Sequence, residues 1–449
     1  MKLSVYEQSQ IPVRSRADEE RHCISHDQAS GLVELGERMG APVASWHSPG
    51  AIRIHQFVGV IRQGDLQLEI LPKLDGLSEP SQVRKNLLAM LAATQDLDVR
   101  ASDVVGFLES SEPFICALAR LYCNRLLEAV RKGLRQDYVY FSELLPHIRG
   151  KVDWPAQARL HVTQRLDFHC LYDERSNDTP LNRTLKSALL TANSLLEGAR
   201  VSRVVNEIRN AMDGIADVCP YPEQMARLHT DRMNRHLEPL LTLAKLLLGN
   251  RNPDLGRSTR GSRDTFAIVW DMNVLFEEYV GRVADDVMLP KGFTVDLQED
   301  AAAYLAAEAT TRKKAFLLRP DIRVRHRRKS MVVADTKWKR LDPRQSNFGV
   351  SQSDVYQVLA YANRYGTYLA VLIYPHHPAL GIPGLQREFL IRGASSQNVS
   401  IRVATLDLSM LESVPGQVEQ GLSIEVHGGV LQGAQSAMMK PKTEEVAVR

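Results

Sequence analysis

The sequence has few cysteines and no cysteine pair of metal-binding type. Its five cysteines are odd in number and scattered over 449 residues, and no Cys-x-x-Cys string occurs. This usage fits a reducing compartment better than a disulfide framework or a zinc site. We therefore expect structural, unpaired thiols at all five positions. They are Cys23, Cys116, Cys123, Cys170 and Cys219.

Long apolar runs are also absent. The N-terminal segment MKLSVYEQSQ has no uninterrupted apolar stretch of signal-peptide type, and the longest apolar runs elsewhere are far too short to span a bilayer. No Gly-x-x-x-x-Gly-Lys-[Ser/Thr] string occurs, so a nucleotide-binding loop of that kind is not expected. The sequence thus predicts a cytoplasmic protein that contacts no membrane.

An excess of charge of one sign is missing as well. The formal net charge is only +3, so any affinity for nucleic acid has to come from local clusters. One basic cluster lies between residues 319 and 329, and its members are candidates for phosphate contacts, with a solvated hairpin tip as the alternative. The candidates are Arg323, Arg325, Arg327, Arg328 and Lys329.

The length and the 44% hydrophobic content predict two or three domains with sizeable cores. Polarity alternates over residues 52–61 and 66–71, which predicts strands, whereas helical spacing dominates 83–134 and 181–248. The turn-forming segment 251–264 predicts a domain boundary. The predicted fold class is α+β and multidomain, with a β-rich N-terminal region (1–100), a mostly helical middle (101–255), a C-terminal region with a mixed sheet (256–430) and a disordered tail (431–449).

The C-terminal region is predicted to run helix, three strands, helix, strand. The helices are expected over about 266–287 and 354–364, and the strands over 294–298, 322–325, 331–338 and 368–374. Ser353 is the expected N-cap of the second helix, and Gly366 lies just past its end.

The two middle strands are predicted to pair as a hairpin around a basic turn. With residues 327–329 as a three-residue loop, Ile322 faces Ala334 and Val324 faces Val332, which builds one apolar face. A slip of one residue would destroy this face, so the register is well defined.

The same register brings two acids and a lysine together. Asp321 then lies opposite Asp335, and alternation puts Lys337 on their face while Thr336 points away. Carboxylate oxygens suit Mg²⁺, and an ammonium group offsets charge that grows on a phosphate. We therefore predict that this trio holds a divalent metal against a phosphodiester. The alternative is an ordinary ion pair between Asp335 and Lys337 on an exposed strand.

Both predicted helices add candidate residues. Gln357 and Tyr361 lie four residues apart and so share one helix face, although a polar surface patch would look the same. Glu277 and Glu278 sit at similar angles on opposite sides of the buried stripe of the first helix. Periodicity does not choose between these two glutamates, and solvated helix charges are the alternative for both.

The order αβββαβ, with Pro320-Asp321 on the second strand and Asp335-Thr336-Lys337 on the third, resembles the PD-(D/E)XK nuclease superfamily. The resemblance implies that Asp321 and Asp335 bind Mg²⁺, with the carbonyl of Thr336 completing the metal shell, and that Lys337 positions or activates the attacking water. Two further site residues, Gln357 and Tyr361, match the Gln-x-x-x-Tyr element of the RecB-like branch, and the resemblance favours Glu277 as a further acid.

Strings elsewhere in the chain resemble the McrC family, the nuclease subunit of the McrBC modification-dependent restriction system. They lie in order at 57–61, 68–73, 147–151, 173–182, 318–321, 335–337 and 353–361. The resemblance implies that a partner McrB-like AAA+ GTPase ring binds GTP and recognises double-stranded DNA carrying modified cytosine such as 5-methylcytosine, while this chain cuts. It also implies that the region around 52–73 stimulates GTP hydrolysis in the ring.

Two other hypotheses remain open. One is a stand-alone RecB-like nuclease that acts on DNA without a GTPase, and the other is a non-catalytic adaptor that activates a GTPase ring. Cleavage by the purified chain with Mg²⁺ alone would favour the first, and GTPase stimulation without cutting would favour the second. His376 and His377 stand between prolines and are expected to be loop residues, not metal ligands.

Overall fold

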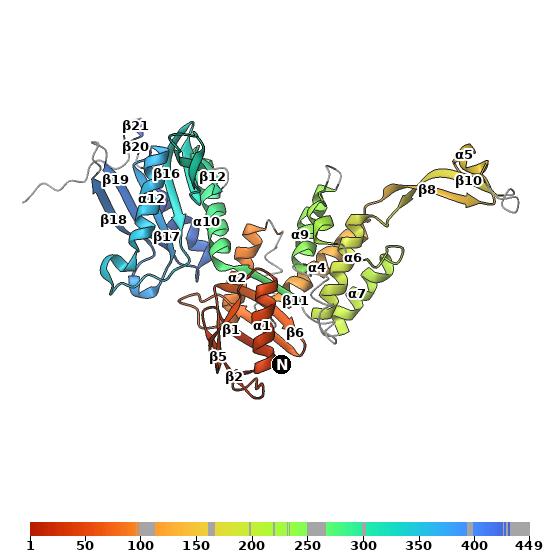
Figure 1. Cartoon of the computed structure of the whole chain (residues 1–449), viewed down its shortest axis with the longest axis horizontal. Helices are drawn as coiled ribbons and strands as arrows, with labels where there is room; N and C mark the ends of the chain where they lie inside the picture. The colour runs from red at the N-terminus through yellow and green to blue at the C-terminus, as the bar shows by residue number, and fades with distance from the viewer. Residues whose placement is uncertain are drawn as a thin grey trace, which may run out of the picture. The chain divides into compact units, whose positions relative to one another are not determined.

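The computed structural model describes residues 1–95, 97, 113–159, 167–196, 199–218, 221–230, 232, 234–248, 266–298, 302–392, 398–424, 426–427 and 430–431. This part of the chain is mixed α/β with several sheets, and it forms two compact units (Figure 1). The first unit comprises residues 1–71 and 95–269, and the second comprises 72–94 and 270–449. The predicted boundary at 251–264 and the predicted tail beyond residue 431 lie outside the described residues, and the four-part division stays a prediction.

The N-terminal region contains two four-stranded sheets, as its β-rich composition predicts. One has the order β1-β7-β6-β11 and the other β3-β2-β5-β4. Helix α1 (His26–Arg38) begins with a capping box, in which Ser25 and Gln28 each accept from the other's backbone N–H. The strands are β1 (Lys2–Tyr6), β2 (Gln10–Arg14), β3 (Ile24–Ser25), β4 (Ala44–Ser48), β5 (Ala51–Ile54), β6 (Phe57–Gln63), β7 (Leu66–Leu71) and β11 (Phe266–Asp271).

Two predictions in this region are wrong. Residues 52–61 are not one strand, because the chain leaves β5 after Ile54 and enters β6, which belongs to the other sheet. Residues 266–271 are not the start of a helix but strand β11, which lies beside β6. A Cβ atom on Gly59 would approach the Ile268 carbonyl oxygen to 2.0 Å, and Gly59 has a φ of +146°. The close approach of β11 therefore requires glycine at this point of β6.

The middle of the chain is largely helical, as its spacing predicts. Its helices are α4 (Phe114–Lys132), α5 (Trp154–Gln157), α6 (Pro180–Leu195), α7 (Ala199–Ala211), α8 (Pro222–Ala226) and α9 (Glu238–Leu248). Helical spacing did not predict the long hairpin of β8 (Asp137–Leu145) and β10 (Phe168–Ser176), which pair along their whole lengths, with the short β9 (Lys151–Val152) beside β10.

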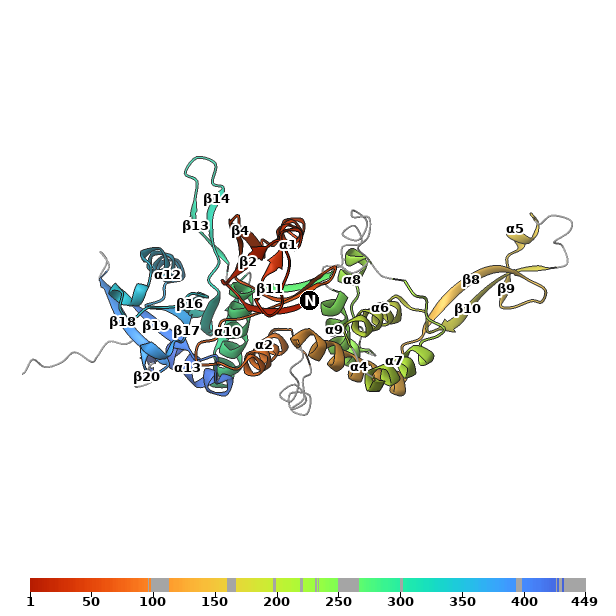
Figure 2. The same cartoon turned by 90° about the horizontal axis from the view of Figure 1, so that it is seen from below.

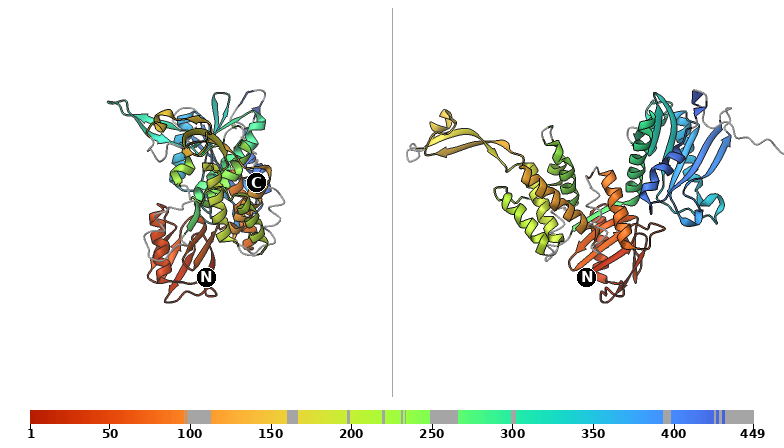
Figure 3. Two further views of the ribbon diagram at one scale, coloured as in Figure 1. Left: turned by 90° about the vertical axis from the view of Figure 1, so that its right-hand side faces the viewer. Right: turned by 180° about the vertical axis from the view of Figure 1, so that it is seen from behind.

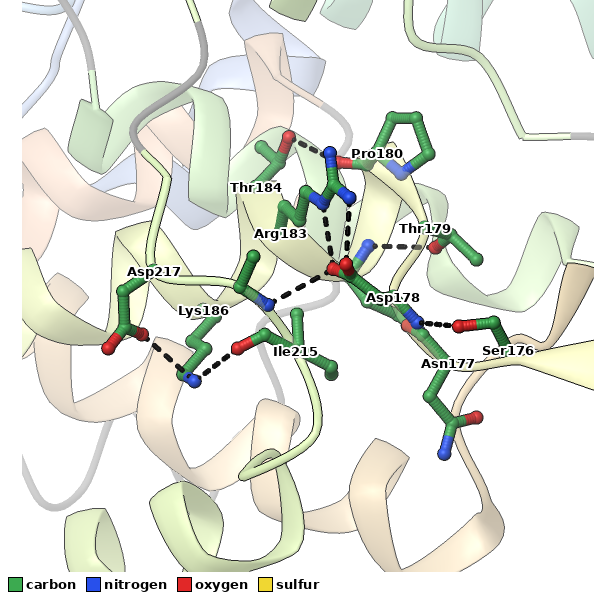
Figure 4. A network of polar contacts seen from close by, with 12 residues as sticks. Ser176, Asn177, Asp178, Thr179, Pro180, Arg183, Thr184, Lys186, Ile215 and Asp217 are labelled. Carbon is green, nitrogen blue, oxygen red and sulfur yellow. Dashed lines mark hydrogen bonds and ion pairs between the residues drawn. The ribbon is translucent and has the colours of Figure 1, made fainter. Parts of the chain in front are cut away.

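Asp178 fixes the end of this hairpin to the helices. Its carboxylate accepts two hydrogen bonds of 2.7 Å from Arg183 and one of 3.0 Å from the Ala216 N–H. These bonds, with Arg183 as the largest cause, lower the pKa of Asp178 to about 2. Nearby, Lys186 donates to the Ile215 carbonyl and pairs with Asp217 at 2.9 Å (Figure 4). This part of the string 173–182 therefore has an architectural role.

The second unit is built on a six-stranded mixed sheet of order β12-β15-β16-β17-β19-β18 (Figure 3). Strand β15 is antiparallel to β12 and β16, strands β16, β17 and β19 are parallel, and β18 is antiparallel to β19. The strands are β12 (Thr294–Leu297), β15 (Ile322–His326), β16 (Lys329–Thr336), β17 (Leu369–Pro375), β18 (Gly384–Arg392) and β19 (Asn398–Leu406). Further strands are β13 (Ala303–Ala307), β14 (Lys314–Leu318), β20 (Val426–His427) and β21 (Val430–Leu431).

Helices cover both faces of this sheet. Helix α12 (Gln352–Tyr365) packs Val358 and Ala362 into a core with Val333 and Val403. Helix α13 (Val414–Leu422) lies on the opposite face, because Gly421 abuts Ala404, whose side chain points away from that of Val403. Helix α10 (Met272–Met288) packs against α13 and α2 (Pro80–Thr94). The sheet is thus the central layer of the unit, with helices on both of its faces.

The predicted order of helix, three strands, helix and strand is found as α10, β12, β15, β16, α12 and β17, with the unpredicted hairpin β13–β14 inserted after β12. Ser353 is not the N-cap of α12. The Ser351 side chain accepts from the Asp354 N–H and starts the helix two residues earlier than expected. Gly366, with a φ of +63°, ends the helix as predicted.

The cysteine prediction is confirmed where it can be tested, because Cys23, Cys116, Cys123 and Cys170 are buried and unpaired. Cys219 lies outside the described residues. In the part of the chain that the structure describes, no helix combines the length and the apolar character needed to cross a membrane.

Candidate functional site

The β15–β16 hairpin has the predicted register at the end where the acids lie. Ile322 pairs with Ala334 and Val324 with Val332, as predicted. A bulge then shifts the register by one residue, so that His326 pairs with Lys329. The turn consequently contains the two residues 327–328 instead of the predicted three, and the bulge absorbs the difference.

This register brings Asp321 and Asp335 together. Asp335 is 1% exposed near the end of β16, and Asp321 is partly buried just before β15 begins. Burial raises the pKa of both carboxyls to about 7. The charge of Glu277 adds to the rise at Asp321, and the charge of Asp321 adds to the rise at Asp335. Two acids held this way resist simultaneous ionisation unless a cation joins them.

Lys337 supplies the nearest cation. Its Nζ lies 2.6 Å from Asp335 Oδ2, and the lysine side chain is 27% exposed. Burial lowers the pKa of Lys337, but the Asp335 charge outweighs this and raises the pKa overall. Apart from this ion pair, Asp335 Oδ2 is buried without a hydrogen-bond partner among the described residues. An ionised carboxylate has several lone pairs, so Asp335 can act as a metal ligand and keep its ion pair with Lys337.

Thr336 does not point away from the acids as predicted. Its N–H and its hydroxyl donate to Asp321 Oδ2 at 2.6 and 2.8 Å. Strand β16 ends at this residue, so simple alternation no longer determines its side chain direction. Thr336 therefore holds the Asp321 carboxylate in place, and its bonds lower the pKa of Asp321 against the larger effect of burial.

Gln357 and Tyr361 on α12 complete a chain of hydrogen bonds around the site. Lys337 Nζ donates to Gln357 Oε1 at 3.2 Å, Gln357 Nε2 donates to the Tyr361 hydroxyl at 2.8 Å, and that hydroxyl donates to the Arg319 carbonyl at 3.1 Å. Burial raises the pKa of Tyr361 to about 12, so its hydroxyl keeps its proton. The chain links β16, α12 and the segment that leads into Asp321.

The two glutamates of α10 occupy different surroundings. Glu277 lies against Asp321 and raises the pKa of that carboxyl, and its own Oε1 accepts from Gln298 Nε2 at 2.6 Å. Glu278 is half-buried, and burial raises its pKa against the opposing charge of Arg282. The structure therefore places Glu277, and not Glu278, beside Asp321, and its membership of the site stays a prediction.

A second lysine–acid pair beside the site was not predicted from the sequence. Lys339 Nζ lies 3.1 Å from Asp354 Oδ2, and the Tyr374 hydroxyl donates to the same oxygen at 3.1 Å. The charge of Asp354 contributes to the raised pKa of Asp335. No strand spacing pointed to this pair, because Lys337 and Lys339 both follow the end of β16.

The basic cluster divides into two groups. Arg325 forms an ion pair with Asp296, and Arg323 donates to Ser330 Oγ at 2.8 Å and stacks over Tyr365. These two residues are engaged within the unit. The three at the turn are exposed and free to meet solvent or a polyanion. They are Arg327, Arg328 and Lys329.

No group of three or more His, Cys, Asp or Glu side chains within the described residues is arranged to hold a metal ion alone. His376 is buried with Nδ1 2.9 Å from Thr405 Oγ1, and His377 caps the next turn, so both are loop residues as predicted. A metal between Asp321 and Asp335 would complete its shell with other oxygens. Mg²⁺ fits this donor set, because it commonly takes one or two carboxylates together with waters and substrate phosphates.

Comparisons with known proteins give concordant results. The family described as McrBC 5-methylcytosine restriction system component matches residues 52–375. A curated relative, the type IV methyl-directed restriction enzyme EcoKMcrBC of Escherichia coli (strain K12), is 20% identical over 159 residues, which cover 34% of this chain and 45% of that protein. The matched stretch thus spans less than half of that relative.

One of two similar solved structures shares the fold over nearly the whole chain. A chain of the refined half-complex from the tetradecameric assembly of Thermococcus gammatolerans McrB AAA+ hexamers with bound McrC has a TM-score of 0.69 at 18% identity, covering 94% of this chain and 99% of that chain. A chain of the cryo-EM structure of the Thermococcus gammatolerans McrBC complex has a TM-score of 0.49 at 20% identity, covering 64% and 88%. Because the family match extends over well more than half of its length, this chain belongs to the McrBC 5-methylcytosine restriction system component family.

Proposed function

We propose that this chain is the DNA-cutting subunit of a modification-dependent, type IV restriction system, and that Asp321, Asp335 and Lys337 form its active centre. The observation that carries the proposal is the burial of two carboxylates on adjacent strands, both with raised pKa values, next to one half-buried lysine. Buried like charges cost stability, so their presence in one place favours a catalytic or metal-binding role.

The fold of the second unit supports the proposal. The order α10, β12, β15, β16, α12 and β17, with three antiparallel strands that continue into parallel ones, resembles a PD-(D/E)XK core. In such a core the acids lie on the second and third strands, which are β15 and β16 in this chain. We therefore assign the second unit as a nuclease unit of this superfamily.

Asp321 and Asp335 would hold Mg²⁺ together with the carbonyl oxygen of Thr336. When bound, Mg²⁺ polarises the phosphodiester and acidifies water. The two Thr336 donors keep Asp321 oriented, and the raised pKa values of the two acids make their ionised forms dependent on a nearby cation. Glu277, which lies against Asp321, is a candidate further acid of the same site.

Lys337 would orient the attacking water and offset the negative charge that develops on the phosphate. Its ammonium has two fixed partners, Asp335 Oδ2 and Gln357 Oε1. Gln357 is in turn held by Tyr361, so both residues position the lysine and neither needs to touch the phosphate. Such positioning matters because small displacements of a catalytic group lower rates strongly.

We infer the partners from the relatives, which are an McrC chain bound to AAA+ McrB hexamers and a methyl-directed restriction enzyme. The chain would work with an McrB-like AAA+ GTPase ring on double-stranded DNA that carries modified cytosine, with GTP bound by the ring. The N-terminal region around 52–73 would stimulate GTP hydrolysis. The assembly would act in the cytoplasm, where foreign DNA is met.

The test is Asp335→Ala in the complex of the full chain with its GTPase. We expect cleavage of methylated DNA to be abolished while GTP-dependent DNA binding and GTP hydrolysis continue. Undiminished cleavage would overturn the assignment of the active centre. Cleavage by the wild-type chain with Mg²⁺ and no GTPase would instead favour a stand-alone nuclease, and stimulated GTP hydrolysis without any cleavage would favour a non-catalytic adaptor.

A further inference from the structure

The hairpin of β13 and β14, called the β-arm here (residues 303–318), extends from the nuclease unit next to the candidate site (Figure 2). Its strands form a separate two-stranded sheet, with Ala303 opposite Leu318. The root is fixed, because Leu318 packs against the core under α12 and Arg364 Nε donates to the Tyr304 carbonyl at 2.6 Å. The remainder of the β-arm is exposed to solvent.

The β-arm presents several exposed apolar side chains. Phe316 is 73% and Leu305 48% exposed, and the register on either side of this position places them opposite each other. Tyr304 and Leu317 form the neighbouring pair, at 39% and 41% exposed. A lone two-stranded ribbon cannot bury such groups itself. Apolar side chains gathered on an exposed ribbon indicate a binding partner.

The charge of the β-arm tip indicates what charge a partner would carry. Between residues 303 and 318 the sequence has three basic residues, Arg312, Lys313 and Lys314, and one acidic residue, Glu308. All four are exposed, and the Glu308 carboxylate accepts a hydrogen bond from Thr311. A basic tip with exposed apolar groups behind it matches a polyanion that also offers apolar groups, which duplex DNA does through its phosphates and the thymine methyl groups of the major groove.

We propose that the β-arm enters the major groove of the DNA duplex that the nuclease unit cuts. This inference rests on the proposed function. The major groove admits a two-stranded β-ribbon, and basic residues at the tip would contact the phosphates that flank it. Strand β14 ends at Leu318, three residues before Asp321, so a duplex gripped by the β-arm lies beside the two acids. The β-arm thus positions the substrate without choosing its sequence.

The first test uses Thr310, an exposed tip residue. The matched variants Thr310→Lys and Thr310→Glu differ in charge at one position. In the full chain carrying Asp335→Asn to prevent cutting, Thr310→Glu should weaken binding of a short methylated duplex by about 3- to 10-fold, and Thr310→Lys should strengthen it. Lys313→Gln should reduce the slope of log K against log salt by about 1. Lys132→Glu, at the exposed end of α4, is the control and should leave both quantities unchanged.

The second test measures cutting. Phe316→Ala, in the otherwise wild-type chain with its GTPase, should lower cleavage of methylated DNA about 10-fold because an apolar contact with the duplex is lost, while GTP hydrolysis stays unchanged. Wild-type DNA binding and cleavage in all arm variants would overturn the β-arm proposal and leave the proposed function intact. Loss of complex formation with the GTPase, at unchanged DNA affinity, would also overturn it and make the β-arm a protein-binding surface. Failure of the proposed function would be a different result, namely DNA cleavage that the Asp335→Ala change does not reduce.

Discussion

Lys337 Nζ and Gln357 Oε1 are joined by a hydrogen bond of 3.2 Å that connects the end of β16 to α12. The same ammonium pairs with Asp335 at 2.6 Å, so the lysine is held from two sides. A lysine side chain is flexible, so its ammonium group is no longer held in one position when either partner is removed. The helix that covers the sheet therefore also determines where the ammonium group lies.

Gln357→Ala should lower DNA cleavage by roughly 10- to 100-fold with DNA binding unchanged, because Lys337 loses one of its two partners. Gln352→Ala is the matched control, since Gln352 is an exposed glutamine at the start of the same helix. Gel-based cleavage rates of the assembled complex measure the effect. Equal rates for the two variants would contradict a positioning role for Gln357.

Glu277 and Glu278 offer a second matched comparison. Glu277→Gln should lower cleavage at least about 10-fold and raise the Mg²⁺ concentration needed, because it removes a carboxylate that lies against Asp321. Glu278→Gln should cut at close to the wild-type rate, since the Glu278 pKa is governed by burial and Arg282 alone. Titrations of the cleavage rate with Mg²⁺ separate the two. A larger loss from Glu278→Gln would reverse the assignment.

The hairpin register could be predicted because apolar residues alternate on both strands, so only one register buries Ile322 against Ala334. The placement of Asp321 near Asp335 followed from it. Periodicity could not choose between Glu277 and Glu278, because both are equally far from the buried stripe of α10, and only the family resemblance favoured Glu277. The choice depends on where the start of β15 lies against that helix, which is a tertiary contact.

The other structural features that the sequence predicted wrongly, or did not predict, have equally local causes. The β-arm went unpredicted because its strands, AYLAA and KAFLL, are rich in alanine and leucine and lack the β-branched residues that signal a strand. The N-cap of α12 was misplaced because Ser351 and Ser353 are both plausible caps, and only the hydrogen bond to Asp354 N–H distinguishes them. The direction of the Thr336 side chain was wrong because alternation holds only inside a strand, and β16 ends there.

The raised pKa of Asp321 leads to a prediction about stability. A carboxyl that holds its proton more tightly in the folded state than in the unfolded state makes folding less favourable as pH rises through the interval between the two pKa values. That interval runs from the ordinary 3.8 to about 7. In Mg²⁺-free buffer, Asp321→Asn should therefore stabilise the chain by about 1–2 kcal/mol at about pH 8 and by much less at about pH 4.

Urea unfolding at the two pH values measures this difference. Asp286→Asn, an exposed change on α10, is the control and should show no such pH dependence. Addition of Mg²⁺ should stabilise the wild-type chain at the higher pH and leave Asp321→Asn unaffected, because a ligand that binds the folded state stabilises it. A variant that is destabilised equally at both pH values would contradict the cost assigned to the buried charge.

Asp178→Asn tests an acid of the opposite kind. Its folded pKa is lowered to about 2 from the ordinary 3.8, so it stabilises the fold above about pH 4, and this contribution is lost as pH falls toward 2. The variant breaks the paired bonds to Arg183, which should cost about 2 kcal/mol at neutral pH. Asp213→Asn, on the exposed segment that precedes Ala216, is the matched control and should have little effect.

Urea unfolding should show the difference between Asp178→Asn and the wild type shrinking as pH falls below about 4. Because Asp178 fixes the root of the β8–β10 hairpin and lies outside the nuclease unit, DNA cleavage by the folded variant should be retained, and a loss of unfolding free energy that did not change with pH would contradict the charge-based account.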